Sequence, residues 1–350
     1  MDIAREQGPA RSAERRPADE AAGPADDLAR KGTGRSAGRL PDFFVVGHAR
    51  SGTTALHEML TQHPQIFVGL KEPRFFATEL RERDLARTNP TPQTLAEYKA
   101  WFSGAAPGQV VGDISPDYLW SRDAARLIAE VRPDARIIAI LREPVSFLRS
   151  LHRQWLRHYV ETEVDFAKAI ELERPRHLGQ QMPVSTYWPK ALFYTDHARY
   201  AGQLRRFEQH FPRDRMLVLI YDDYVRDNAA AVRTVLRFLD VDDSVPIIAR
   251  RSNESLHVQS PHIHGTLRRL IVADSRPLKL VKRSLKAITP MTQRQRLLQT
   301  VRKRLVFGEP PPADDQFSIE LRRRLKPEVV ALSEYLDRDL VSLWGYDRLG

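Results

Sequence analysis

The chain has 350 residues, and 42% of them are hydrophobic, which suffices for one large α/β domain or two small ones. Its net charge of +10 and pI of about 9.9 favour an anionic partner, although many arginine-rich proteins are simply basic at their surface. The absence of cysteine excludes disulfides, thiol nucleophiles and thiolate-bound metals, and no apolar run has the length of a membrane span or the position of a secretory signal.

The first 40 residues contain few large aliphatic side chains, so we expect residues 1–40 to form a disordered tail. Short apolar runs typical of buried parallel strands then alternate with amphipathic segments typical of helices. The expected strands are FFVV, QIFVGL, QVVGDI, ARIIAIL and RMLVLIY, and the expected helices cover residues 51–60, 122–131, 144–160, 196–211, 228–239 and 326–344. This alternation predicts one α/β domain over residues 41–350, with a central parallel sheet flanked by helices.

The C-terminal part of this domain contains a basic loop and helical segment over residues 250–308, followed by helices over residues 317–345. Between residues 266 and 304 basic side chains predominate, with Asp274 as the single acid. Two interpretations stay open for this stretch, solvated helices that cap the sheet or a surface that binds a membrane or a polyanion.

The segment from Gly47 to Thr54, GHARSGTT, follows the first strand and opens the first helix. A helix N-terminus after a tight glycine turn binds anions, because its first N–H groups lack partners inside the helix. The candidate anion ligands are Arg50, Ser51, Gly52, Thr53 and Thr54. An ATP-binding loop would have lysine where Thr53 stands, so the loop fits a phosphate but lacks the triphosphate machinery. Strand-to-helix turns of this kind also occur for packing reasons.

A second anion site is predicted after the strand ARIIAIL. Arg142 stands at the carboxyl end of that strand, where doubly wound sheets bind their ligands, and Ser150 lies two turns into the following helix. The two side chains can therefore converge on one further phosphate.

With these two sites, the sequence resembles the sulfotransferases that use 3′-phosphoadenosine 5′-phosphosulfate (PAPS). The resemblance implies that the protein has their P-loop-like fold. GHARSGTT resembles their 5′-phosphosulfate loop and LREPVSFLRS their 3′-phosphate motif. The resemblance continues through KEPRFF, GDISPDYL and LVLIYDDY, and these motifs stand in the family's order over residues 41–240. The most similar branch holds the heparan-sulfate O-sulfotransferases and many bacterial carbohydrate-type enzymes.

The resemblance implies roles for individual residues. Arg50 takes the place of the family's cation at the leaving phosphate. Glu72 takes the place of the general base. The alternative for Glu72 is a surface residue paired with Lys71 or Arg74. Asp113 occupies the position of an acid that orients an acceptor hydroxyl or a basic side chain. Arg251 is a candidate for the family's late basic loop, which reaches the 3′-phosphate or the adenine. The sequence around Arg251 does not show the family's full motif for that loop.

Two positions depart from the heparan branch, which places a lysine where Ile114 stands and often a histidine where Arg74 stands. These departures weaken any close match of the acceptor.

The implied activity is transfer of a sulfuryl group from PAPS to a hydroxyl of a carbohydrate, glycolipid or secondary metabolite, with no metal. We expect a cytoplasmic protein, with the 266–304 segment as a candidate for peripheral membrane contact. No nucleic-acid partner is expected, because no DNA- or RNA-binding signature is present. The alternatives are a P-loop kinase that uses ATP and Mg²⁺, and a non-catalytic protein that binds anions through its basic segment.

Overall fold

In a computed structural model of the protein, the described residues are 38–81, 91–158, 160–183, 186, 188–248, 257–258, 307–308 and 315–349. All of them belong to one compact unit, Gly38–Gly350. The expected tail up to residue 37, Arg251 and the basic stretch 266–304 lie outside the described residues, and their predictions stay open.

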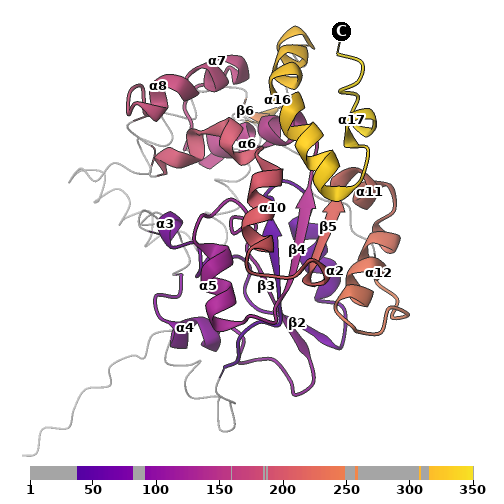
Figure 1. Ribbon diagram of the computed structural model, residues 1–350. Helices are drawn as coiled ribbons and strands as arrows, with labels where there is room; N and C mark the ends of the chain where they lie inside the picture. The colour runs from indigo at the N-terminus through magenta and orange to yellow at the C-terminus, as the bar shows by residue number, and fades with distance from the viewer. Residues whose placement is uncertain are drawn as a thin grey trace, which may run out of the picture. The chain divides into compact units, whose positions relative to one another are not determined.

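A five-stranded parallel sheet forms the centre of this unit (Figure 1). The strands are β1 (Phe43–Gly47), β2 (Ile66–Val68), β3 (Val110–Ile114), β4 (Arg136–Leu141) and β5 (Met216–Ile220), in the order β2-β3-β1-β4-β5. Central β1 pairs with β3 and β4, so that Phe44 lies between Asp113 and Ile137. Every residue of β1 is buried, as expected for a strand covered on both faces. The α/β class and the five predicted strands are confirmed.

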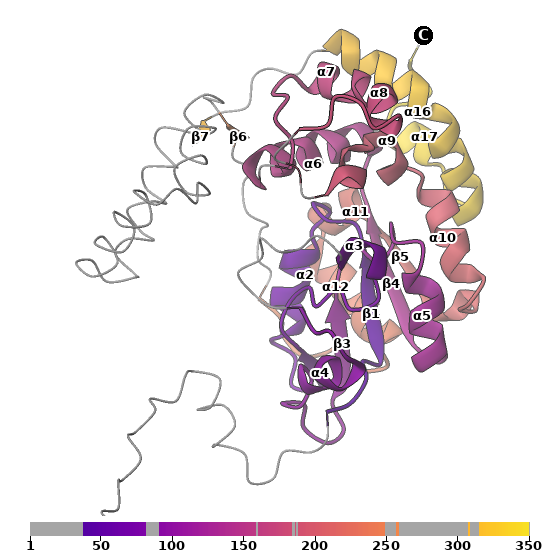
Figure 2. The same ribbon diagram turned by 90° about the vertical axis from the view of Figure 1, so that its left-hand side faces the viewer.

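Helices cover both faces of the sheet (Figure 2). One face packs against α2 (Thr53–Leu60) and α12 (Asn228–Phe238), through a cluster that includes Phe43, Leu56 and Val235. The other face packs with α5 (Ala124–Val131), α6 (Pro144–His158), α10 (Tyr200–Glu208) and α16 (Asp315–Leu336) around Phe44. The alternation of Phe43 and Phe44 between the two clusters follows from the period of two residues in a strand.

Several elements differ from the predicted bounds. The helix expected over 196–211 is two helices, α9 (Tyr194–His197) and α10, and the last helix starts at Asp315 and is followed by α17 (Leu340–Leu343). The segment 161–190 contains α7 (Phe166–Glu171), α8 (Glu173–His177) and the start of η1 (Pro189–Leu192). The remaining short helices are α3 (Thr78–Arg81), α4 (Leu95–Ala100), η2 (Arg213–Arg215) and α11 (Tyr221–Arg226), and the two-residue strands β6 (His257–Val258) and β7 (Phe307–Gly308) pair antiparallel. Within the described ranges no helix has the length and apolarity needed to span a membrane.

A buried ion pair joins α8 to the segment that precedes α7. Arg176 donates to Glu161 through both terminal nitrogens, at 2.7 and 2.9 Å. The same carboxylate also accepts hydrogen bonds from the Tyr194 hydroxyl at 3.1 Å and from the amides of Thr162 and Glu163. The side chains of Arg176 and Glu161 are 1% and 0% exposed.

We expect Arg176→Met to lower the free energy of unfolding by about 3–5 kcal/mol, because it leaves a carboxylate buried without its counter-charge. Urea denaturation followed by circular dichroism measures this. The double variant Arg176→Met/Glu161→Leu should recover only part of the loss, because it removes the unpaired charge but also takes the acceptor from the Thr162 and Glu163 amides. A single variant as stable as the wild type would contradict the prediction.

Candidate active site

The loop between β1 and α2 is built for close approach of a ligand to the backbone. Gly52 has φ 94°, and a Cβ there would lie 2.9 Å from the Tyr224 ring, so glycine is required. Arg50 also has a positive φ, 65°, which is uncommon outside glycine. The Ser51 hydroxyl is fully buried and has no hydrogen-bond partner among the described residues. Since buried polar groups are normally paired, this hydroxyl is available to an anion in the loop.

The predicted second anion site joins directly to this loop. Arg50 donates from Nε to the Ser150 hydroxyl at 3.0 Å, and Arg142 donates to the Arg50 carbonyl oxygen at 3.3 Å. Arg142 also lies over the ring of Tyr221, 4.7 Å from its centroid. The structure thus brings together Arg50, Arg142 and Ser150, which the sequence had placed in two separate motifs.

Two further arginines enter the same region, and sequence reasoning missed them. Burial lowers the pKa of Arg50, and the charges of Arg157, Arg142 and Arg153 lower it further. The pKa of Arg153 is lowered by burial and by Arg142 and Arg149, and its Nε has no hydrogen-bond partner within the described part of the chain. Ser150, Arg153 and Arg157 are three and four residues apart on α6, and this helical spacing was the available signal. Mutual repulsion among these guanidinium groups would be relieved by a ligand with several negative charges.

Glu72 stands beside this anion site, in the loop that follows β2. The Glu72 amide donates to the Ile114 carbonyl at 3.1 Å, which ties the loop to the end of β3. Lys71 bonds the Thr54 hydroxyl of α2 at 2.5 Å and lies 3.3 Å from the Glu72 carboxylate. Glu72 and Arg74 both have positive φ, 61° and 52°. Backbone strain of this kind is concentrated at functional sites.

Two cations hold Glu72 in its charged form. Arg74 lies 2.8 Å from the Glu72 carboxylate and 2.5 Å from Asp117, which is itself nearly buried. Burial alone would raise the pKa of Glu72, but Arg74 and Lys71 outweigh it and keep that pKa below its usual value. The ion pairs of Glu72 with Lys71 and Arg74, which the sequence offered as an alternative to a catalytic role, are therefore present. They leave the carboxylate ionised at neutral pH.

Asp113 does not face the open side of the site. Its two oxygens accept hydrogen bonds from Tyr98 at 2.7 Å, Tyr118 at 2.9 Å and Ser115 at 2.8 Å, and the residue is 1% exposed. The resemblance implied that Asp113 orients an acceptor hydroxyl or a basic side chain, and that role stays a prediction. Asp113 anchors the loop after β3, and a buried aspartate cannot be distinguished from an exposed one by sequence motif alone.

Burial raises the pKa of Asp113 to about 6, despite the hydrogen bonds that favour its charged form. The folded state then binds this proton more tightly than the unfolded state, so ionisation should lower the stability as the pH rises from about 4 to about 6. We expect Asp113→Asn to lack this contribution, so that the difference in unfolding free energy between the two proteins changes across this pH range. Urea titrations at pH 4, 5, 6 and 7 measure it, and a pH-independent difference would contradict the prediction.

Other titratable groups near the site are held by packing contacts and hydrogen bonds within the protein. His48 packs between Phe147 and Tyr200, and its Nε2 is 2.7 Å from the Gln203 side-chain oxygen. Burial lowers the pKa of His48 to about 4. Glu173, His177 and Asp196 place ligand atoms within 4.8 Å of one another, a cluster that the spacing of four on α8 could have indicated. Thr195 bonds the Glu173 carboxylate, and the absence of a metal stays a prediction.

A family model described as "Sulfotransferase family" matches residues 41–244, more than half of the chain. The chain belongs to the sulfotransferase family. The match includes the β1–α2 loop, the Glu72 loop and the Arg142–Ser150 motif, and it ends before Arg251 and the basic segment.

Curated relatives of this sulfotransferase include enzymes of heparan sulfate. Heparan sulfate glucosamine 3-O-sulfotransferase 6 of Homo sapiens is 30% identical over 202 residues, which are 57% of this chain and 52% of that protein. Bifunctional heparan sulfate N-deacetylase/N-sulfotransferase 3 of Homo sapiens is 27% identical over 207 residues, 58% of this chain and 22% of that protein. The chain spans about half the length of the O-sulfotransferases it matches.

A solved structure supports the fold. The crystal structure of a sulfotransferase from Alicyclobacillus acidocaldarius aligns with a TM-score of 0.60 over 87% of this chain and 99% of that chain, at 23% identity. The family and fold expected from the motifs are thus confirmed.

Proposed function

We propose that this sulfotransferase moves the sulfuryl group of PAPS to a hydroxyl of a carbohydrate, glycolipid or secondary-metabolite acceptor. The observation that carries the proposal is the joined anion site, in which Arg50 bridges the β1–α2 loop to Ser150 beside Arg142. A donor with phosphates at both its 5′ and 3′ positions would satisfy the buried Ser51 hydroxyl, the Arg153 Nε and the repelling arginines together. The relatives' names support an acceptor of carbohydrate type.

In this reaction the acceptor oxygen attacks sulfur, and the bond between sulfur and the 5′-phosphate oxygen breaks. Negative charge grows on that phosphate oxygen, and Arg50 is placed in the loop to stabilise it. Glu72 takes the proton of the acceptor hydroxyl as the new bond forms, because its carboxylate is ionised and lies next to the same loop. Lys71 connects the two sides, since it contacts both Thr54 and Glu72.

The test is to incubate the protein with PAPS and a panel of hydroxyl-bearing acceptors in a chelator, and to measure release of 3′-phosphoadenosine 5′-phosphate (PAP). ATP with Mg²⁺ is run in parallel for the kinase alternative. We expect acceptor-dependent PAP release that needs no Mg²⁺. Phosphate transfer from ATP without any sulfuryl transfer would overturn the proposal.

A further inference from the structure

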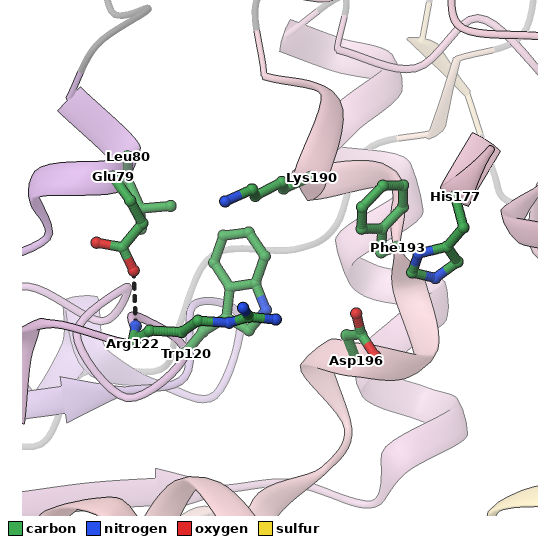
Figure 3. A pocket seen from close by; sticks show the side chains of 8 residues that line it. All are labelled: Glu79, Leu80, Trp120, Arg122, His177, Lys190, Phe193 and Asp196. Carbon is green, nitrogen blue, oxygen red and sulfur yellow. Dashed lines mark hydrogen bonds between the residues drawn. The ribbon is translucent and has the colours of Figure 1, made fainter. Parts of the chain in front are cut away.

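A pocket of about 130 Å³ lies between two segments that are far apart in the sequence (Figure 3). Its first wall comes from α3 and the loop after β3, with Glu79, Leu80, Trp120 and Arg122. Its second wall comes from α8, η1 and α9. That wall consists of His177, Lys190, Phe193 and Asp196. The volume is close to that of a cavity that accepts one benzene ring.

The acids of this pocket are engaged. Glu79 accepts hydrogen bonds from the Ser121 hydroxyl at 3.0 Å and from the Arg122 amide at 2.6 Å. Asp196 pairs with Arg199 at 3.3 Å.

The two basic side chains of the pocket differ from the acids in their contacts. Within the described ranges, the side chains of Arg122 and Lys190 make no ion pair and no hydrogen bond. In Figure 3 they lie on either side of the Trp120 indole, so the pocket places two cations without direct ion-pair partners next to an aromatic surface, while its two acids bond to other groups.

Trp120 is held rigidly enough to serve as a platform. One stacking contact joins its ring to His197, with centroids 4.2 Å apart and planes inclined by 21°, and Trp188 meets it edge-on at 5.5 Å. The side chain is still partly exposed and lines the pocket. An indole fixed in this way gains from stacking a ring without first losing side-chain freedom.

The segments that line the pocket also carry residues of the proposed active site or bond to them. Trp120 and Arg122 belong to the loop that also carries Asp117, the ion-pair partner of Arg74 beside Glu72. Glu79 lies on the short helix that follows the Glu72 loop. On the other side, His197 connects through Gln203 to His48 of the β1–α2 loop, with contacts of 3.2 and 2.7 Å.

We propose that this pocket binds the acceptor through a six-membered ring that bears an anionic group. The ring stacks on Trp120, and the anion lies between Arg122 and Lys190. The inference rests on the proposed function, because it makes the pocket the acceptor side of the same site. The ring can come from an acidic sugar or from an aromatic acid, and the two share this chemistry.

The test uses protein labelled with 5-fluorotryptophan, in which the five tryptophans give separate ¹⁹F signals and Trp120→Phe identifies one of them. Methyl β-glucuronide, 4-hydroxybenzoate and neutral methyl β-glucoside are titrated in turn, with PAP present. We expect at least one acidic ring to shift the Trp120 signal and to bind about tenfold more tightly than the neutral glucoside. Which acidic ring binds identifies the source.

The variant Arg122→Ala/Lys190→Ala should lose this preference, and Arg126→Ala/Lys168→Ala, which removes the same charge elsewhere, should keep it. The other four ¹⁹F signals report whether each variant is folded. Equal binding of neutral and acidic rings, or unchanged binding by the first variant, would overturn the inference. If PAP binds in calorimetry while no ring does, the pocket assignment alone fails, and if a ring binds while PAP does not, the proposed function fails.

Discussion

Replacing Arg142 and Ser150 together by alanine is expected to weaken PAP binding by roughly 100-fold, since each contributes a charge-assisted or neutral hydrogen bond to one phosphate. Ser150 also receives the hydrogen bond from Arg50 at 3.0 Å, so its loss frees the cation that joins the two halves of the site. Isothermal titration calorimetry in a chelator, with PAP as the titrant, measures the change. The same titration with ATP and Mg²⁺ tests whether the site binds a nucleoside triphosphate instead of PAP.

The matched control is Arg237→Ala/Ser244→Ala, an arginine and a serine in exposed contacts with Asp243 and Asp242. This control should bind PAP as the wild type does. The stability of the free protein gives a second readout, because the charge of Arg142 repels those of Arg50 and Arg153 and lowers their pKa values. Loss of Arg142 relieves that repulsion, so weakened PAP binding should come without a matching loss of stability in the free protein. PAP affinity equal to that of the wild type would contradict the two-phosphate assignment.

The strands and the anion loop could be predicted because their signals are local. FFVV and ARIIAIL are short apolar runs bounded by turn residues, and parallel strands buried on both faces have this composition. Ser150 was found from its spacing of eight residues from Arg142, which places it two turns into the helix that follows the strand. The end of β4 and the start of α6 then placed both residues at the carboxyl edge of the sheet.

What the sequence did not reveal depends on contacts between distant segments. Arg153 and Arg157 were not singled out from the sequence, because only the fold brings their charges close to Arg50, about 100 residues earlier in the chain. Asp113 read as a catalytic acid, but Tyr98 comes from α4 to cover it, and no local pattern indicates such burial. The pocket at Trp120 joins residues 79–122 to residues 177–196, a pairing that only the tertiary structure provides.

Glu72→Gln is expected to lower the rate of sulfuryl transfer by about 100- to 10,000-fold, the usual contribution of a general base. Glutamine keeps the size of the side chain but cannot take the acceptor proton. PAP binding should stay within about twofold of wild type, because Glu72 contributes no donor to a phosphate and sits across Lys71 from the loop. The control Glu130→Gln alters an exposed glutamate paired with Arg126 and should leave both measurements unchanged.

The pH dependence tests the same assignment through Arg74. In the wild type Arg74 and Lys71 hold the pKa of Glu72 below its usual value against the opposing effect of burial, so the base stays ionised to a lower pH than a free glutamate. Arg74→Met removes the larger of the two charge contributions, and burial then raises the pKa. The acid limb of kcat/KM should therefore move to higher pH in Arg74→Met, while PAP binding changes little. If the acid limb stays in place and Glu72→Gln still transfers sulfuryl groups, the base lies elsewhere, and the Arg74–Glu72–Asp117 network would only shape the loop.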